Sequence, residues 1–346
     1  MRSDRLTFAL RNNLLALPEA GEILVLRPRG GDSLSMLPKA RLTVVQSFRP
    51  DYDDFAARGY HVLAETPKSV PFAAALVCVP RAKAEAYALL AEAAAAIGPA
   101  GIILVDGQKT DGIDSLLRDL RRRFTLSEPV AKAHGKLFSF RPGADLMPDW
   151  AAKLRTVGDH TEGNSVAPPE QGFQTLPGVF SADGPDAGSA LLAANLPANL
   201  PARIIDLGAG WGYLSRAILL RPGVKELHLV EAEATALKCA RLNITDPRAQ
   251  FHWADATLFK LDRGVDAVIC NPPFHTARDP DPALGLAFIQ AAARLLAPHG
   301  TLWMVANRHL PYDRTLATLF REVEDIGSDR RFRLTRAARP IRPPRP

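Results

Sequence analysis

The segment RIIDLGAGWGYL, residues 203–214, indicates the fold most directly. An apolar run ends at Asp206, and Gly208, Gly210 and Gly212 follow before a helical pattern begins. Glycine lets a backbone turn sharply and lets a ligand approach more closely than a Cβ atom permits. The helix that follows presents free N–H groups and the positive end of its dipole. We therefore predict a strand, a glycine loop and a helix that together bind a small molecule.

Two more acids end the next two predicted strands. Glu231 closes the run LHLVE, where it can accept two hydrogen bonds from ribose hydroxyls. Asp255 follows the run FHWA, where it can accept a hydrogen bond from an adenine amine. A dinucleotide enzyme has its third glycine one residue beyond Gly212, and Asp206 suits a ligand with an amino group better than a pyrophosphate. The pattern thus favours a nucleoside with an amino group over a dinucleotide.

A further strand ends in an unusual polar loop. The apolar run VDAVI leads into CNPPFH, residues 270–275, where neither proline can donate to a sheet ladder. With this loop the chain resembles the class I S-adenosylmethionine-dependent methyltransferases, whose fold is a seven-stranded, mostly parallel sheet. The resemblance implies S-adenosylmethionine as the cofactor. It assigns cofactor binding to Asp206, Gly208, Gly210, Gly212, Glu231, Asp255 and Asn271.

In that family an Asn-Pro-Pro-aromatic loop marks methylation of a planar nitrogen, such as the exocyclic amine of a base or a glutamine amide. The lone pair of such a nitrogen is delocalised, and hydrogen-bond acceptors on both N–H bonds draw the nitrogen toward a tetrahedral shape. The Asn271 side chain and the Pro272 carbonyl can be these acceptors, on a loop that Pro272 and Pro273 make rigid. Phe274 can stack on the base. The resemblance implies that these four residues are catalytic, while His275 is either a proton relay or a plain loop residue.

The two halves of the chain resemble each other. Strand-like and helix-like segments alternate in both, which predicts parallel α/β domains. ALVCVPRAK can be superposed on AVICNPPFH, and ILVLRPRGGDSL on RIIDLGAGWGYL. The superposition places Cys78 on Cys270, Leu26 on Asp206 and Gln46 on Glu231. Coincidence between two generic α/β halves is the alternative. The first half, however, lacks most of the polar and glycine residues of the second half at the matched positions, which favours a degenerate first copy without a cofactor site.

More of the chain is similar to one family, the ribosomal RNA guanine-N2 methyltransferases of the small subunit (RsmC-like). LPGVFSADGPDAGSALL, NPPFH, MVANRHLPY and the degenerate first half carry this resemblance. It implies methylation of the exocyclic N2 amine of a guanine in ribosomal RNA, with 16S rRNA favoured, and places Phe180 and Asp186 over the cofactor cleft. The insert TARDPDP, residues 276–282, is longer than the family pattern.

The resemblance also implies the domain organisation. A chain of 346 residues exceeds one ordinary core. We predict two tandem Rossmann-like methyltransferase domains: a degenerate domain for RNA docking at 1–145, a linker at 146–175 and a catalytic domain with a basic tail at 176–346. Three alternatives stay open: a guanine of large-subunit RNA, a glutamine amide of a protein, and a non-catalytic ribosome-assembly factor. A glutamine methyltransferase is expected to carry tyrosine at position 274, and the intact Asn271-Pro272-Pro273 argues against loss of catalysis.

The composition argues against a disulfide framework, a metal site and a membrane location for this activity. The three cysteines have no CxxC spacing, which argues against a disulfide framework or a zinc site. The N-terminal segment has no secretory apolar region, and the longest alanine-rich run is too short to span a bilayer. We expect a cytoplasmic monomer with no metal and no membrane contact, whose partner is ribosomal RNA or the 30S subunit.

The net charge of +6 favours a polyanionic partner. Residues 330–346, RRFRLTRAARPIRPPRP, contain seven arginines and no acid. The first half alternates like an edge strand, and the proline-rich end is expected to be extended. A solvated tail and a contact with RNA phosphates are equally supported. A second basic run, LRDLRRRF at 117–124, would supply the other side of an RNA footprint.

Overall fold

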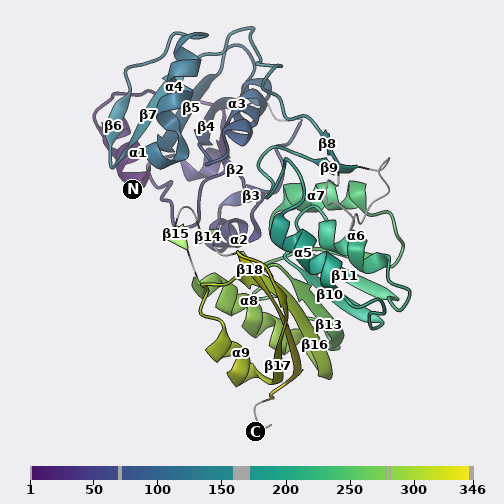
Figure 1. Cartoon of the computed structure of the whole chain (residues 1–346). Coiled ribbons are helices and arrows are strands. Elements are labelled where there is room, and N and C mark those ends of the chain that lie inside the picture. Colours follow the sequence, from purple (N-terminus) through teal and green to yellow (C-terminus); the bar gives the residue numbers. More distant parts are fainter. Residues whose placement is uncertain are drawn as a thin grey trace. The chain divides into compact units, whose positions relative to one another are not determined.

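The computed structural model describes residues 2–68, 72–158, 172–273, 275–276, 279–280 and 282–342. The chain divides into two compact units, Met1–Lys153 and Leu154–Pro346 (Figure 1). The division falls inside the segment that we predicted as a linker. In that segment β8 (Arg155–Val157) pairs antiparallel with β9 (Phe173–Thr175), and 159–171 lies outside the described residues. Among the described helices, none has the length and apolar character needed to span a bilayer.

The first unit contains a seven-stranded sheet with the order β3-β2-β1-β4-β5-β7-β6. The strands are β1 (Glu22–Leu26), β2 (Leu42–Val45), β3 (His61–Leu63), β4 (Phe72–Cys78), β5 (Ile102–Gln108), β6 (Val130–Lys132) and β7 (Gly135–Phe140). The helices of its described part are α1 (Arg2–Arg11), α2 (Arg49–Ala57), α3 (Lys83–Ile97) and α4 (Ile113–Arg121). Strands β3, β2, β1, β4 and β5 are parallel, and β7 runs antiparallel to both of its neighbours.

The central strands of this unit are apolar on both faces. In β1, Leu24 and Leu26 belong to one core cluster, whereas Ile23 and Val25 belong to another. Successive side chains of a strand point to opposite faces, so the two clusters lie on opposite sides of the sheet. A parallel strand buried on both faces reads as a continuous apolar run, which explains the sequence EILVL.

The second unit contains a sheet with the order β12-β11-β10-β13-β16-β18-β17. Its strands are β10 (Arg203–Leu207), β11 (Glu226–Glu231), β12 (Ala249–Trp253), β13 (Val265–Cys270), β16 (Leu296–Asn307), β17 (Phe320–Ser328) and β18 (Phe332–Pro340). The helices of its described part are α5 (Ala187–Asn195), α6 (Tyr213–Leu219), α7 (Ala234–Asn243), α8 (Pro282–Leu295) and α9 (Asp313–Leu319). A short ladder joins β14 (His275–Thr276) to β15 (Asp279–Pro280).

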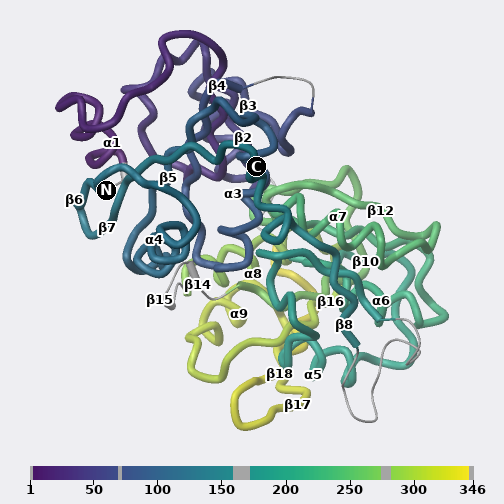
Figure 2. The backbone as a smooth tube through the Cα atoms, turned by 90° about the horizontal axis from the view of Figure 1, so that it is seen from above, coloured from purple at the N-terminus to yellow at the C-terminus, as the bar shows by residue number. Residues whose placement is uncertain are grey.

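The two units share one topology. Counted by position, the strand orders of the two sheets are identical, and in each sheet one strand near the end runs antiparallel to both neighbours. Figure 2 shows the hairpin of β17 and β18 that ends the second sheet. The predicted fold class is confirmed: the chain is an α/β protein with two tandem, mostly parallel, seven-stranded sheets.

The strand ladders correct the predicted superposition by one residue. Leu26 pairs with Val45 in the first sheet, and Leu207 pairs with Val230 in the second. Gln46 therefore still matches Glu231, but Leu26 matches Leu207 and Val25 matches Asp206. On the other side, Val25 pairs with Leu76 and Asp206 pairs with Ile269. Two residues further along, Cys78 therefore matches Asn271 rather than Cys270.

The arginine-rich segment was expected to begin as an edge strand, and this expectation is wrong. Strand β18 lies between β16 and β17 and pairs with both, so β17 forms the edge. The reason is burial at successive positions: Leu334 and Thr335 are both buried, as are Ala337 and Ala338. Small and apolar residues cover both faces of the strand, and the arginines occupy the positions between them.

Candidate active site

The glycine loop after β10 has a left-handed backbone at three positions. The φ angles are +81° at Gly208, +55° at Gly210 and +93° at Gly212, a region that other residues rarely adopt. The Gly208 N–H donates to the carbonyl oxygen of Val230 at 2.9 Å, which ties the loop to β11. A Cβ atom at Gly210 would meet nothing within 4 Å. Gly210 therefore faces open space, where a ligand can approach the backbone.

Glu231 supports this loop from the end of β11. Its Oε2 accepts from the Gly210 N–H at 2.8 Å, and its Oε1 accepts from the Glu233 N–H at 2.8 Å. Burial raises the pKa of the Glu231 carboxyl, and the two backbone donors oppose that shift. Each carboxylate oxygen can accept a second hydrogen bond, so the predicted contacts with two ribose hydroxyls remain chemically available.

Asp206 lies behind the loop and is fully buried. Its Oδ2 accepts from the Ser215 hydroxyl at 2.6 Å, which links β10 to α6. Burial and the charge of Glu231 raise the pKa of Asp206 to about 7, and the Ser215 hydrogen bond opposes this shift. Within the described residues the second carboxylate oxygen, Oδ1, is buried with no hydrogen-bond partner. Asp206 thus supports the loop from inside the core, a position that the sequence did not predict.

Asp255 closes a tight turn after β12. Its Oδ1 accepts from both the backbone N–H and the hydroxyl of Thr257, at 2.8 and 2.6 Å. The side chain is half-buried. The structure places this acid at the end of the strand next to β11, and its contact with an adenine amine stays a prediction.

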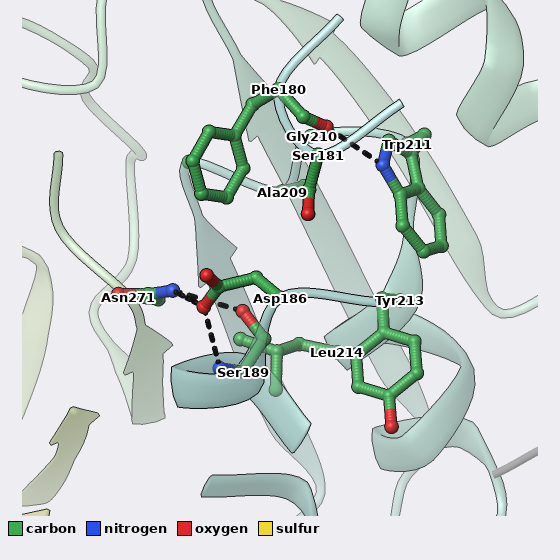
Figure 3. Close-up of a pocket in the computed structure, with 11 residues that line it drawn as sticks. Phe180, Ser181, Asp186, Ser189, Ala209, Gly210, Trp211, Tyr213, Leu214 and Asn271 are labelled. Carbon is green, nitrogen blue, oxygen red and sulfur yellow. Dashed lines mark hydrogen bonds between the residues drawn. The ribbon is translucent and has the colours of Figure 1, made fainter. Parts of the chain in front are cut away.

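A pocket opens in front of the glycine loop (Figure 3). The loop residues Gly208 and Gly210 line it together with Asn271 from the end of β13. The other lining residues are Phe180, Ser181, Asp186, Ser189, Ala209, Trp211, Tyr213 and Leu214. Phe180 and Asp186 are therefore at the site, as the resemblance implied. Ser189 and Trp211 were not foreseen, although Ser189 stands three residues after the N-cap of α5, the spacing of a capping contact.

The amide of Asn271 is held by its nitrogen. Nδ2 donates to Asp186 Oδ2 at 2.8 Å and to Ser189 Oγ at 2.9 Å (Figure 3). Both N–H groups of the amide therefore have partners, and the side-chain oxygen is the group left to accept from a substrate. Pro272 is buried and Pro273 is exposed, while Phe274 lies outside the described residues.

The first unit lacks these groups at the matching positions. Val25 stands where the second unit has Asp206, Gln46 stands where it has Glu231, and Cys78 stands where it has Asn271. Gln46 is buried, and its amide donates to the carbonyl oxygen of Pro28 at 2.5 Å. Its Oε1 accepts from the Phe48 N–H at 2.9 Å and from Arg27 Nη1 at 3.0 Å, so the amide is engaged within its own unit.

The arginines of β18 are already paired. Acids of the same unit hold three of them: Arg333 contacts Asp313, Arg336 contacts Glu324, and Arg339 contacts Glu322. Arg342 donates to the carbonyl oxygens of Arg294 and Leu296, and Arg345 lies outside the described residues. In the first unit, α4 ends with exposed Arg118 and Arg121. Arg122 follows with its side chain 82% exposed and its Nη1 3.8 Å from Asp119 Oδ1.

Comparison with known proteins identifies relatives over most of the chain. The family model described as "Methyltransferase small domain" matches residues 170–336. Two similar proteins are both named ribosomal RNA small subunit methyltransferase C. The one from Shewanella amazonensis is 30% identical over 76% of this chain and 76% of its own, and the one from Alteromonas mediterranea is 30% identical over 85% and 84%.

A solved structure resembles this chain over most of its length. It is the T. thermophilus 16S rRNA N2 methyltransferase (RsmC) in complex with AdoMet and guanosine. The match has a TM-score of 0.77 and 21% identity, and it covers 94% of this chain and 90% of the other. At that identity the match shows a common fold.

Proposed function

We propose, because this chain belongs to the family of ribosomal RNA small subunit methyltransferase C proteins, that it methylates the exocyclic N2 amine of a guanine in 16S ribosomal RNA. S-adenosylmethionine is the methyl donor and supplies a methyl group bonded to a positively charged sulfur. The described relative with the same fold binds AdoMet and guanosine, which supports both parts of the proposal.

The residues of the second unit fit this cofactor. Gly210 has the left-handed backbone and the open space that a close ligand requires. Glu231 keeps acceptor capacity for ribose hydroxyls at the end of the neighbouring strand. Asp255 ends the strand beyond it, where the adenine amine would lie. Asp206 contributes indirectly, because it is fully buried and holds α6 through Ser215.

The observation that carries the proposed chemistry is the orientation of Asn271. An exocyclic amine of guanine is a weak nucleophile, because its lone pair is delocalised into the ring. Since Asp186 and Ser189 take the amide N–H groups of Asn271, its oxygen is the atom that accepts from the amine. A fixed acceptor needs no reorganisation during the reaction, which is the main source of its catalytic effect.

The substrate nitrogen loses a proton without a strong base. A nitrogen that has gained a methyl group carries positive charge and becomes acidic, so water or a weak acceptor suffices. The backbone carbonyl of Pro272 is proposed as the second acceptor, on a loop that two prolines make rigid. Phe274 is proposed to stack on the guanine.

The first unit is proposed to dock RNA without chemistry of its own. Its exposed arginines on and after α4 support this role, whereas the arginines of β18 are engaged with acids of their own unit. The proposed substrate is ribosomal RNA, either free or assembled in the 30S subunit. The expected monomeric state and cytoplasmic location stay predictions.

Nucleoside mass spectrometry of ribosomal RNA tests the proposal. RNA from a strain without the gene should lack one N2-methylguanosine in 16S rRNA, and the purified protein should restore it. Loss of the modification from large-subunit RNA alone, or methylation of a protein glutamine, would assign the activity to one of the alternatives. Unchanged RNA and protein would contradict methylation by this chain.

A further inference from the structure

We propose that Asp186 is a positioning residue, which orients the amide of Asn271 for the reaction and acts on the substrate through that amide. This inference rests on the proposed function, in which the Asn271 oxygen accepts from the reacting amine. It adds a role for a side chain that lies beside Asn271 in the lining of the pocket (Figure 3).

One carboxylate oxygen of Asp186 makes two contacts. Oδ2 accepts from Asn271 Nδ2 at 2.8 Å and from the Ser189 N–H at 3.0 Å. The second contact makes Asp186 the N-cap of α5, so its carboxylate is fixed by the helix backbone. Ser189 closes the triangle, because its hydroxyl oxygen accepts the other N–H of the Asn271 amide at 2.9 Å.

This arrangement selects one of the two orientations of the amide. If the amide turned by 180°, its oxygen would face the anionic Asp186 carboxylate and its N–H groups would face the substrate amine. Two donors would then meet, and the attacking nitrogen would have no acceptor on that side. A hydrogen bond to a charged group is typically stronger than one between neutral groups. Asp186 therefore contributes more than Ser189 to the preference for this orientation of the amide.

The frame behind the carboxylate is rigid. Helix α5 is packed through Leu192 and Ala193, which are 0% and 1% exposed. Gly188 allows the carboxylate to lie close, since a Cβ atom there would be 3.0 Å from Asp186 Oδ2 and 3.2 Å from the ring of Phe332. The carboxylate is therefore held by the Ser189 N–H and by the Asn271 amide, next to a helix that is packed into the core.

A direct contact between Asp186 and the cofactor is the competing role, because Asp186 lines the same pocket. The two roles differ in their dependence on Asn271. A residue that acts only through Asn271 has no further effect once that amide is gone, whereas a residue that binds the cofactor keeps its effect.

A double-mutant cycle on the full chain separates the roles. We expect Asp186→Ala to lower kcat by about ten-fold or more. Ser189→Ala keeps the N-cap and removes one acceptor, and we expect a fall of about three-fold. In the Asn271→Ala background, Asp186→Ala should change kcat by less than about two-fold. Asp186→Asn keeps an oxygen that can cap the helix and hold the amide, and it should recover most of the activity.

Two outcomes would overturn the proposal. One is an equal fall in kcat from Asp186→Ala in the presence and absence of the Asn271 side chain. The other is a wild-type kcat in the Asp186→Ala variant. Failure of the proposed function is distinct from both, because the wild-type protein itself would then form no N2-methylguanosine.

A second measurement does not depend on turnover. The side-chain amide signals of Asn271 in the ¹⁵N-labelled protein can be assigned by their absence in Asn271→Ala. We expect faster hydrogen exchange of these protons in Asp186→Ala than in wild type, because their charged partner is removed. Identical exchange would show that Asp186 does not hold the amide.

Discussion

Arg27 in the first unit occupies the place that Gly208 holds in the second. The N–H of each residue donates at 2.9 Å to a backbone carbonyl oxygen of the neighbouring strand, that of Val45 or Val230, and both residues have positive φ. The Arg27 side chain then turns back into its own unit, where its Nε lies 3.1 Å from Glu85 Oε1. A large ion-paired side chain therefore stands where the second unit has only hydrogen.

This relationship predicts one cofactor site per chain. Titration calorimetry of the full-length protein with S-adenosylmethionine should give a stoichiometry of one. Gln46→Ala, at the position that matches Glu231, should leave that binding curve unchanged. A stoichiometry of two would mean that the first unit has kept a working site.

Asn271→Ala is expected to lower turnover by about 10²-fold or more, because one fixed acceptor is typically worth about 2.7–4 kcal/mol in the transition state. Cofactor affinity should change little. Asn195→Ala is a matched control, since Asn195 is an exposed asparagine of the same unit. Single-turnover rates with saturating cofactor measure the effect, and equal rates for Asn271→Ala and wild type would make the Pro-Pro turn purely structural.

Glu231→Ala is expected to weaken cofactor binding more than it lowers the turnover rate at saturating cofactor. The change removes the acceptor for the Gly210 N–H as well as the proposed ribose contact, so we expect a rise in Kd of about ten-fold or more. Glu226→Ala, at the other end of the same strand, removes an ion pair with Arg203 and should leave Kd unchanged. Calorimetry on both variants checks this, and similar decreases in affinity would argue against a specific role for Glu231.

Asp206 is expected to make stability depend on pH. Its folded pKa, about 7, lies above the ordinary value of 3.8, so the folded state holds its proton more tightly than the unfolded state. Stability from this group is fully present below about pH 4 and is lost as pH rises toward 7. The loss is at most about 1.4 kcal/mol per pH unit. Asp206→Asn removes this dependence.

The matching measurement is urea denaturation of wild type and Asp206→Asn from pH 5 to 8. The stability of wild type relative to the variant should fall as pH rises to 7 and level off above it. Burial lowers the pKa of His228 and His252, which gives the opposite trend below pH 6.5. That contribution is common to both proteins and cancels in the difference. A constant difference across the range would contradict a raised pKa for Asp206.

The exposed arginines near the end of α4 are expected to contact RNA phosphates. Replacement of Arg118, Arg121 and Arg122 by glutamine should flatten the dependence of log affinity on log salt by about 0.7 to 0.9 for each phosphate that is no longer neutralised. Replacement by lysine keeps the charges and should keep the slope. Filter binding with an rRNA fragment measures both, and equal slopes for the glutamine variant and wild type would place the footprint elsewhere.

The fold class and the succession of strands and helices in the second unit could be predicted from the sequence, because apolar strand-like runs alternate there with helical patterns. The one-residue error in the superposition has a physical cause. Strands such as β1 and β4 are buried on both faces, so their sequences show no alternation that would fix the register. Only the ladder of hydrogen bonds shows that Cys78 matches Asn271.

Side-chain partners distant in sequence could not be foreseen either. Asn271 and Asp186 are 85 residues apart, and their contact depends on how α5 packs against the sheet. The basic tail was misjudged for the same reason, since the acids that pair with Arg336 and Arg339 lie on a neighbouring strand. Likewise Asp206 was expected to face the ligand, but it is fully buried and accepts a hydrogen bond from Ser215.

The left-handed turn at Arg27 shows what keeps a backbone path when the side chains around it differ. A positive φ at a residue other than glycine costs on the order of 1 kcal/mol or more, and yet Arg27 has it in a unit that lacks the acids of the second unit. The sheet requires this backbone conformation, because the N–H of Arg27 donates to the carbonyl oxygen of Val45 on the neighbouring strand. The two units can therefore differ at the side chains of this corner while they share the path of the backbone, so the likeness between them is visible in torsion angles where the residues themselves differ.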